Sequence, residues 1–96
     1  MSELRVVAVL TATPGSADVI RDVLLALAAA TREEEGCVSY ELFASDAADT
    51  FVTVETWRDA ADLKEHLASP HLAAAMKAGR DHFAGQPAIH QLTPLT

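Results

Sequence analysis

The stretch TFVTVETWRDAADLKEHLASPH, from Thr50 to His71, decides how this chain folds. Its first part is rich in β-branched and aromatic side chains, which favours a strand over Thr50–Trp57. Asp59 can cap the helix that follows. Ser69-Pro70 then ends that helix and starts another, because Ser is a preferred N-cap and Pro suits the first helical position. A strand and a broken helix therefore follow one another directly.

The rest of the chain alternates between strand and helix patterns around this stretch. Leu4–Ala12 is apolar on both faces and predicts a buried strand. Ala17–Arg32 has apolar residues at helical spacing, beginning with Val19 and Ile20, and predicts a helix with one buried stripe. Cys37–Ser45 alternates and forms a hairpin with the strand from Thr50, and Ala88–Leu95 predicts a last strand. The order is β-α-β-β-α-β, with the second helix broken at Pro70. We expect one α+β domain over residues 1–96, a ferredoxin-like split β-α-β with a four-stranded antiparallel sheet and its helices on one face.

The first strand also predicts a partner. Two helices can cover only one face of a four-stranded sheet, yet Val7 and Val9 place apolar side chains on the other face. A large exposed apolar surface usually marks an interface. A second copy of the chain, packed sheet against sheet, is therefore expected to form a homodimer.

Composition excludes several classes of partner. The formal net charge of −7 and the absence of a basic run argue against binding to nucleic acid or to an anionic membrane. No apolar run approaches the roughly 20 residues that span a bilayer, and the N-terminus lacks a signal-peptide pattern. The single cysteine, Cys37, cannot form an internal disulfide and favours a reducing compartment. We therefore expect a cytoplasmic protein.

Motifs for cofactors and metals are weak. The four glycines match neither a dinucleotide-binding turn nor a phosphate loop, so no cofactor is predicted. His66 and His71 are separated by the helix break and do not share one helical face, as a metal-binding i, i+4 pair would. Glu55 or Glu65 could add a carboxylate, but this spacing is not diagnostic. The sequence predicts no metal site.

His66 and Glu55 are the strongest candidates for functional side chains. His66 flanks an apolar stripe, which leaves two interpretations open: a boundary histidine bonded to a neighbour, or a base in an apolar pocket. Glu55 shares a strand face with Trp57 and needs a partner, for which Arg80 or Arg5 are candidates. The acidic run 33–35 is interpreted as a solvated helix end.

Several short motifs together resemble the antibiotic biosynthesis monooxygenase family, close to its quinol monooxygenase branch. The resemblance covers essentially the whole chain, and its most specific part is the spacing from Glu-x-Trp to His-Leu-x-Ser-Pro-His. It rests on Glu34-Glu35-Gly36-Cys37, Tyr40-Glu41-Leu42, Phe51-Val52, Glu55-Thr56-Trp57, Leu63 and His66-Leu67-Ala68-Ser69-Pro70-His71.

The resemblance implies a dimeric α+β barrel and a reaction. Several members of the family oxygenate phenols or hydroquinones to quinones with molecular oxygen as co-substrate and no cofactor. A small aromatic substrate is then expected, either a hydroquinone or an electron-rich, fused phenol of polyketide type, with His66 as base or proton shuttle. The resemblance further implies that Trp57 and Tyr40 act as aromatic wall and hydrogen-bonding group, and that Glu55 or His71 orients the substrate or base.

Other branches of the family set the alternatives. The haem-degrading branch has an asparagine on the first strand and a histidine late in the second helix, where this chain has Ala8 and the Ala75-Met76 region. That substitution disfavours haem degradation. An isomerase of a phosphorylated sugar derivative, and a dimeric binding or accessory module without catalysis, remain open, because a fold does not fix a function.

Overall fold

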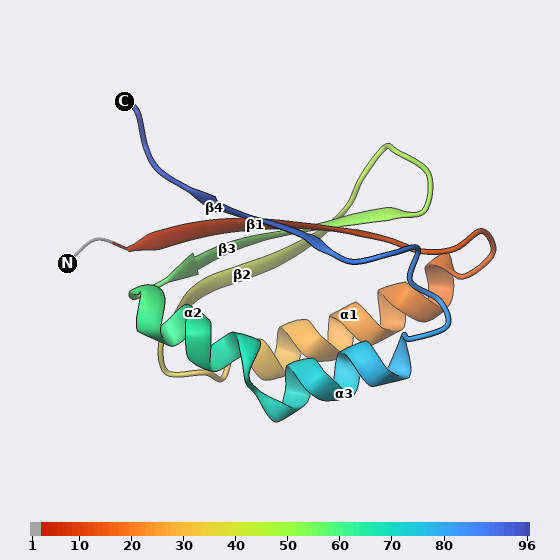
Figure 1. The fold of residues 1–96 in the computed structure, drawn as a ribbon, viewed down its shortest axis with the longest axis horizontal. Helices are drawn as coiled ribbons and strands as arrows, with labels where there is room; N and C mark the ends of the chain where they lie inside the picture. The colour runs from red at the N-terminus through yellow and green to blue at the C-terminus, as the bar shows by residue number, and fades with distance from the viewer. Residues whose placement is uncertain (1–2) are drawn as a thin grey trace.

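A computed structural model describes residues 3–96 and has the predicted order of elements, with the second helix divided in two (Figure 1). The elements are β1 Leu4–Thr11, α1 Ala17–Thr31, β2 Cys37–Ala44, β3 Thr50–Trp57, α2 Ala60–Leu67, α3 Pro70–Ala78 and β4 Ala88–Leu92. The last strand is shorter than predicted. It pairs with β1 from Val9↔Ala88 to Arg5↔Leu92. Residues after Leu92 have no strand to pair with, because β1 begins at Leu4.

The four strands form one sheet in the order β2-β3-β1-β4, and every neighbouring pair is antiparallel. Figure 1 shows α1, α2 and α3 together on one face of this sheet. The predicted ferredoxin-like fold is therefore confirmed. None of the helices within residues 3–96 is both long and apolar enough to cross a membrane.

The core lies between the helices and the inner face of the sheet. Alternate residues of β1 point into it, namely Val6, Ala8 and Leu10. They meet the buried stripe of α1, which consists of Ile20, Leu24, Leu27, Ala28 and Thr31. Val19, which the helical spacing also placed in the stripe, is 40% exposed. It lies one position before Ile20, so it is rotated by about 100° from Ile20, away from the rest of the stripe.

The outer face of the sheet has no helix over it. The side chains that point outward include Val7 and Val9 of β1, Val52 and Val54 of β3, and Phe43 of β2. Phe43 is 48% exposed. The chain thus has one packed face, which contains the site described below, and one open apolar face.

Candidate functional site

A cavity of ≈ 100 Å³ lies between the inner face of the sheet and the helices. Most of its wall is aliphatic, and four polar side chains interrupt it. These are Tyr40 of β2, Thr53 and Glu55 of β3, and His66 of α2. A small apolar cavity with a few convergent polar groups is the usual form of a small-molecule site.

Glu55 is buried, and its carboxylate is satisfied by its own strand. Oε2 accepts a hydrogen bond of 2.6 Å from the Thr53 hydroxyl, and Oε1 accepts one of 2.9 Å from the Trp57 indole nitrogen. Residues two apart on a strand share a face, so β3 alone aligns all three side chains. The predicted partners Arg5 and Arg80 are therefore wrong, because two neutral donors on the same strand already bind both oxygens.

Tyr40 lies directly opposite Glu55 in the pairing of β2 with β3 and is also buried. Burial raises the pKa of Tyr40 well above its usual range, and the charge of Glu55 adds to the rise. Its phenol therefore keeps its proton throughout the physiological range. In the cavity Tyr40 can donate a hydrogen bond, but it cannot serve as a base.

His66 lies in the last turn of α2 and is 4% exposed. Its ring packs against Trp57, with centroids 4.6 Å apart, and tilts toward Tyr40 at 5.9 Å. Nδ1 lies 2.7 Å from Oε2 of Glu34. An ionised carboxylate can only accept, so Nδ1 carries the proton and Nε2 keeps a lone pair in the neutral ring. His66 lines the cavity whereas Glu34 does not, which makes Nε2 the nitrogen available to a bound molecule.

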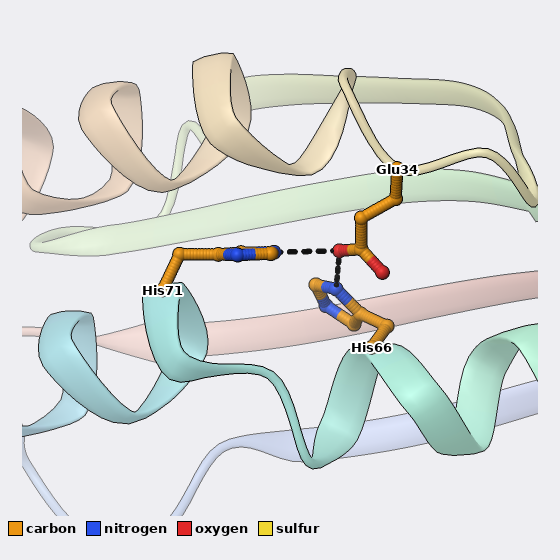
Figure 2. Close-up of side chains that lie close together, drawn as sticks. All are labelled: Glu34, His66 and His71. Carbon is orange, nitrogen blue, oxygen red and sulfur yellow. Dashed lines mark hydrogen bonds and ion pairs between the residues drawn. The ribbon is translucent and has the colours of Figure 1, made fainter.

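Glu34 connects His66 to the second histidine of the helix junction. Figure 2 shows Glu34 descending from the loop between α1 and β2, with the rings of His66 and His71 directed toward its carboxylate. The same oxygen, Oε2, also lies 2.7 Å from Nε2 of His71. The interpretation of residues 33–35 as a solvated helix end is thus wrong for Glu34, whose side chain is only 16% exposed.

The loop that holds Glu34 is fixed from both sides. The Cys37 N–H donates to the Glu34 carbonyl at 3.1 Å, and the Arg58 N–H donates to the Gly36 carbonyl at 2.9 Å. Gly36 is in close contact with α2, because a Cβ at this position would collide with the side chain of Asp62. Asp62 in turn accepts two hydrogen bonds from the Arg58 guanidinium, which holds the pKa of Asp62 below its usual range.

The break between α2 and α3 brings the two histidines to one point. The Ser69 hydroxyl donates to the His66 carbonyl at 2.7 Å and accepts from the Leu72 N–H at 3.3 Å. It thereby ends α2 and caps α3, whose first residue is Pro70. The predicted restart of the helix at Ser69-Pro70 is confirmed. Its consequence is that His66 and His71 reach Glu34 from two different helices.

The structure divides the predicted site residues into two layers. Tyr40, Glu55 and His66 line the cavity, while Trp57 and His71 lie outside it and contact His66 or its partners. Trp57 is fully buried and supports Glu55 and the His66 ring instead of forming a cavity wall. Sequence reasoning missed Glu34. One signal existed: three glutamates at a helix C-terminus oppose the helix dipole and had no local explanation.

Known proteins share this fold and part of this sequence. A profile described as antibiotic biosynthesis monooxygenase matches residues 4–78. Rv0793 of Mycobacterium tuberculosis, whose name proposes a monooxygenase, is 36% identical over 70 residues, or 73% of this chain and 69% of that protein. The crystal structure of PA3566 from Pseudomonas aeruginosa has a TM-score of 0.91 at 31% identity and covers 100% of this chain and 97% of that one. The structure of Rv0793 has a TM-score of 0.88 at 30% identity, covering 99% and 97%.

Proposed function

The chain belongs to the antibiotic biosynthesis monooxygenase family, and from that premise we propose that it oxidises a small hydroquinone or phenol to a quinone with molecular oxygen. The observation that carries the proposal is the wall of the cavity. It is aliphatic except for Tyr40, Thr53, Glu55 and His66, so it suits an aromatic ring that bears one or two hydroxyl groups.

The size of the cavity narrows the substrate class. The volume of ≈ 100 Å³ is below the ~150 Å³ of a cavity known to hold benzene in another protein. A single ring therefore requires a modest widening, and a fused polycyclic phenol requires a large one. Leu67 and Ile89 are both lining residues and half-exposed, which places the mouth of the cavity between α2 and β4. A single-ring substrate is the better fit.

The proposed reaction begins with proton transfer. Nε2 of His66 removes a hydroxyl proton, and the resulting electron-rich anion transfers an electron to oxygen. Recombination of the substrate radical with superoxide forms a carbon–oxygen bond, and the proton held by His66 returns to the peroxide to give a ring hydroperoxide. Loss of the ring proton then breaks the O–O bond and releases water. One oxygen atom remains on the ring as a carbonyl and the other leaves as water, so a phenol and O₂ give a quinone and H₂O.

The neighbouring residues supply position and water exclusion. Tyr40, held as a neutral phenol, donates a hydrogen bond to the substrate oxygen that loses its proton. Glu34 holds Nδ1–H of His66 and so directs the Nε2 lone pair to the cavity, as the carboxylate does in a catalytic triad. Trp57 fixes the plane of the His66 ring. The aliphatic wall keeps water away from the anion.

A phosphorylated substrate is disfavoured by the same cavity. Its lining includes no Lys or Arg among the described residues, and a phosphate group needs such donors or a helix N-terminus. Arg58, just before α2, is already paired with Asp62. Neither Lys64 of α2 nor Lys77 of α3 lines the cavity. The isomerase alternative therefore has less physical support than the oxygenase.

Oxygen consumption tests the proposal. Chelator-treated protein is mixed with single-ring and fused-ring hydroquinones and phenols, and product oxygen is traced with labelled O₂. We expect turnover of a single-ring compound with one labelled oxygen atom in the quinone. His66→Ala should lower turnover by about 10²–10⁴, the usual loss for a general base. Glu65→Gln, an exposed neighbour on the same helix, is the matched control.

Two results would contradict the proposal. Unchanged turnover in His66→Ala would remove His66 from the chemistry. If the protein binds the aromatic compounds but oxygen uptake is no faster than in buffer alone, a binding or accessory module is favoured instead.

We also propose that a second copy covers the open face of the sheet. Val7, Val9, Val52 and Val54 form a continuous outward patch across the two central strands, and Phe43 extends it onto β2. Burial of such a patch is favourable by about 25 cal/mol per Å². Sedimentation should give a dimer for the native chain and a monomer for Val9→Lys. A monomeric native chain at all concentrations would contradict the proposal.

A further inference from the structure

We infer that Glu34, His66 and His71 form a binding site for one divalent transition-metal ion. The inference stands apart from the proposed oxygenase reaction, since it concerns the face of His66 that points away from the cavity. It rests on the convergence of three metal-binding side chains, two imidazoles and one carboxylate, from three separate elements: the loop before β2, α2 and α3 (Figure 2).

The donor atoms lie at distances that an ion could bridge. Nδ1 of His66 and Nε2 of His71 are each 2.7 Å from the same oxygen of Glu34, and all three ligand atoms lie within 4.8 Å of one another. An ion about 2.1 Å from each ligand separates tetrahedral donor atoms by about 3.4 Å. Both N···O distances therefore need to lengthen by less than about 1 Å, a change within reach of side-chain torsions.

The three side chains are held in place before any ion arrives. His66 is packed against Trp57, and its helix is ended by Ser69, which also caps the helix of His71. The Glu34 loop is fixed by the contact of Gly36 with Asp62. Preorganised ligands lose little conformational entropy on binding, which favours affinity.

The electrostatic surroundings favour a cation. The site lies just beyond the C-terminus of α1 and at the last turn of α2, and helix C-termini attract positive charge. Only α3 opposes it, since His71 lies in the first turn of that helix. Glu33 and Glu35 flank Glu34, and the chain has a net charge of −7. A metal ion would add positive charge to this acidic surface.

The ligand set selects the class of metal. Two imidazoles and one carboxylate suit Zn²⁺, Co²⁺, Ni²⁺ or Fe²⁺, whereas Mg²⁺ and Ca²⁺ prefer all-oxygen sites. Three protein ligands leave at least one position for water. His71 is 26% exposed at its side chain, so solvent can reach that position.

Metal binding would also alter the His66 ring. An ion on Nδ1 requires the remaining ring proton to sit on Nε2, the nitrogen proposed as base. If the proposed function holds, a bound ion therefore inhibits it. Binding and inhibition are separate measurements, so failure of the oxygenase reaction leaves the metal site testable.

Calorimetric titration tests the inference directly. Chelator-treated protein is titrated with Zn²⁺, and the absorption spectrum of the Co²⁺ form reports nitrogen ligation. We expect one ion per chain with micromolar or tighter affinity. Glu34→Gln and His71→Asn should each weaken binding by at least the ~10–100-fold that loss of an outer-shell partner costs. An excess of Mg²⁺ should not compete.

Matched variants separate this site from adventitious binding. Glu33→Gln changes an exposed carboxylate of the same loop, and His90→Asn removes an exposed histidine on β4. Both should bind Zn²⁺ as the native chain does, and circular dichroism checks that all variants fold. The inference is overturned if the native chain binds no Zn²⁺ tighter than about millimolar, or if Glu34→Gln and His71→Asn bind it unchanged.

Discussion

Two carboxylates flank His66 and its cavity, and they are held in opposite ways. Glu55 is bound by Thr53 and Trp57, each two residues away on the same strand. Glu34 is bound by His66 and His71, which lie 32 and 37 positions further along the chain. The first carboxylate is a feature of one strand, whereas the second exists only after the helices have packed. If the proposed function holds, Glu55 serves mainly the fold and Glu34 mainly the chemistry.

Of the variants that compare the two carboxylates, Glu34→Gln should have the largest effect on activity. The amide can present N–H to Nδ1 of His66, which would reverse the tautomer and move the lone pair away from the cavity. Loss of the corresponding carboxylate interaction in a serine protease costs about 10⁴ in kcat. We expect a loss of at least 10-fold, by that comparison, with little change in stability.

Steady-state oxygen uptake with the best substrate measures this effect. Glu33→Gln serves as the control, because its carboxylate is exposed in the same loop. If Glu34→Gln turns over substrate as fast as the native chain, Glu34 has only a structural role, like Glu55, and the two carboxylates do not differ in function.

Gly36→Ala should displace Glu34 without changing any of the side chains at the site. Its Cβ would meet the Asp62 side chain, so the loop or α2 must shift. Overpacking of this kind costs about 1–3 kcal/mol of unfolding free energy. Urea unfolding measures that loss, and oxygen uptake measures the displacement of Glu34.

Gly85→Ala is the comparison for this variant. Gly85 has φ +83, and a Cβ added there would have no atom within 4 Å, so alanine meets only backbone strain, about 1–2 kcal/mol. We expect a similar loss of stability in both variants and a loss of turnover in Gly36→Ala alone. Equal turnover in the two would show that the Glu34 loop tolerates a shift.

Glu55→Gln should affect stability and the ionisation of Tyr40. The indole of Trp57 can only donate, so the amide oxygen must face Trp57 and the amide nitrogen must face Thr53, whose hydroxyl has to turn and accept. Both hydrogen bonds then lose their charged acceptor, at a cost of about 1–3 kcal/mol. The variant also removes the negative charge that helps to raise the pKa of Tyr40, so its phenol should ionise at lower pH.

The sign of the pH dependence follows from that raised pKa. Native Tyr40 keeps its proton at pH values where the unfolded chain releases it, so the free energy of unfolding falls as pH rises above about 10. Tyr40 and Trp57 are the only tyrosine and tryptophan, so tyrosinate absorbance and tryptophan fluorescence each report one residue. In the native chain, the ionisation of Tyr40 and the unfolding reported by Trp57 should occur at the same pH. Tyrosinate formation well before unfolding would contradict the burial of Tyr40.

Local patterns were sufficient to predict the fold. An apolar run predicted β1, alternation predicted β2 and β-branched composition predicted β3, and the Ser69-Pro70 pair predicted the helix restart, because each signal depends on neighbours in sequence. The limit of β4 was not predictable, since it depends on where β1 begins. Val19 was misplaced by one helical position for lack of a known packing partner.

The site was predictable only in part. His66, Tyr40 and Glu55 could be proposed from their strand and helix positions and from the family resemblance, and the structure brings them to one cavity. The partners that bind Glu55 could also have been predicted from strand periodicity, because Thr53 and Trp57 share its face. Glu34 was not available in this way. Its partners depend on how the loop before β2 docks on α2, which no local pattern encodes.

Nitrogen-15 NMR of the histidine rings in chelator-treated protein most directly tests the central claim, that Glu34 directs the Nε2 lone pair of His66 into the cavity. At neutral pH we expect His66 to carry its proton on Nδ1 and to have a bare Nε2, and Glu34→Gln to lose this preference. A native His66 with its proton on Nε2 and a bare Nδ1 would contradict the account.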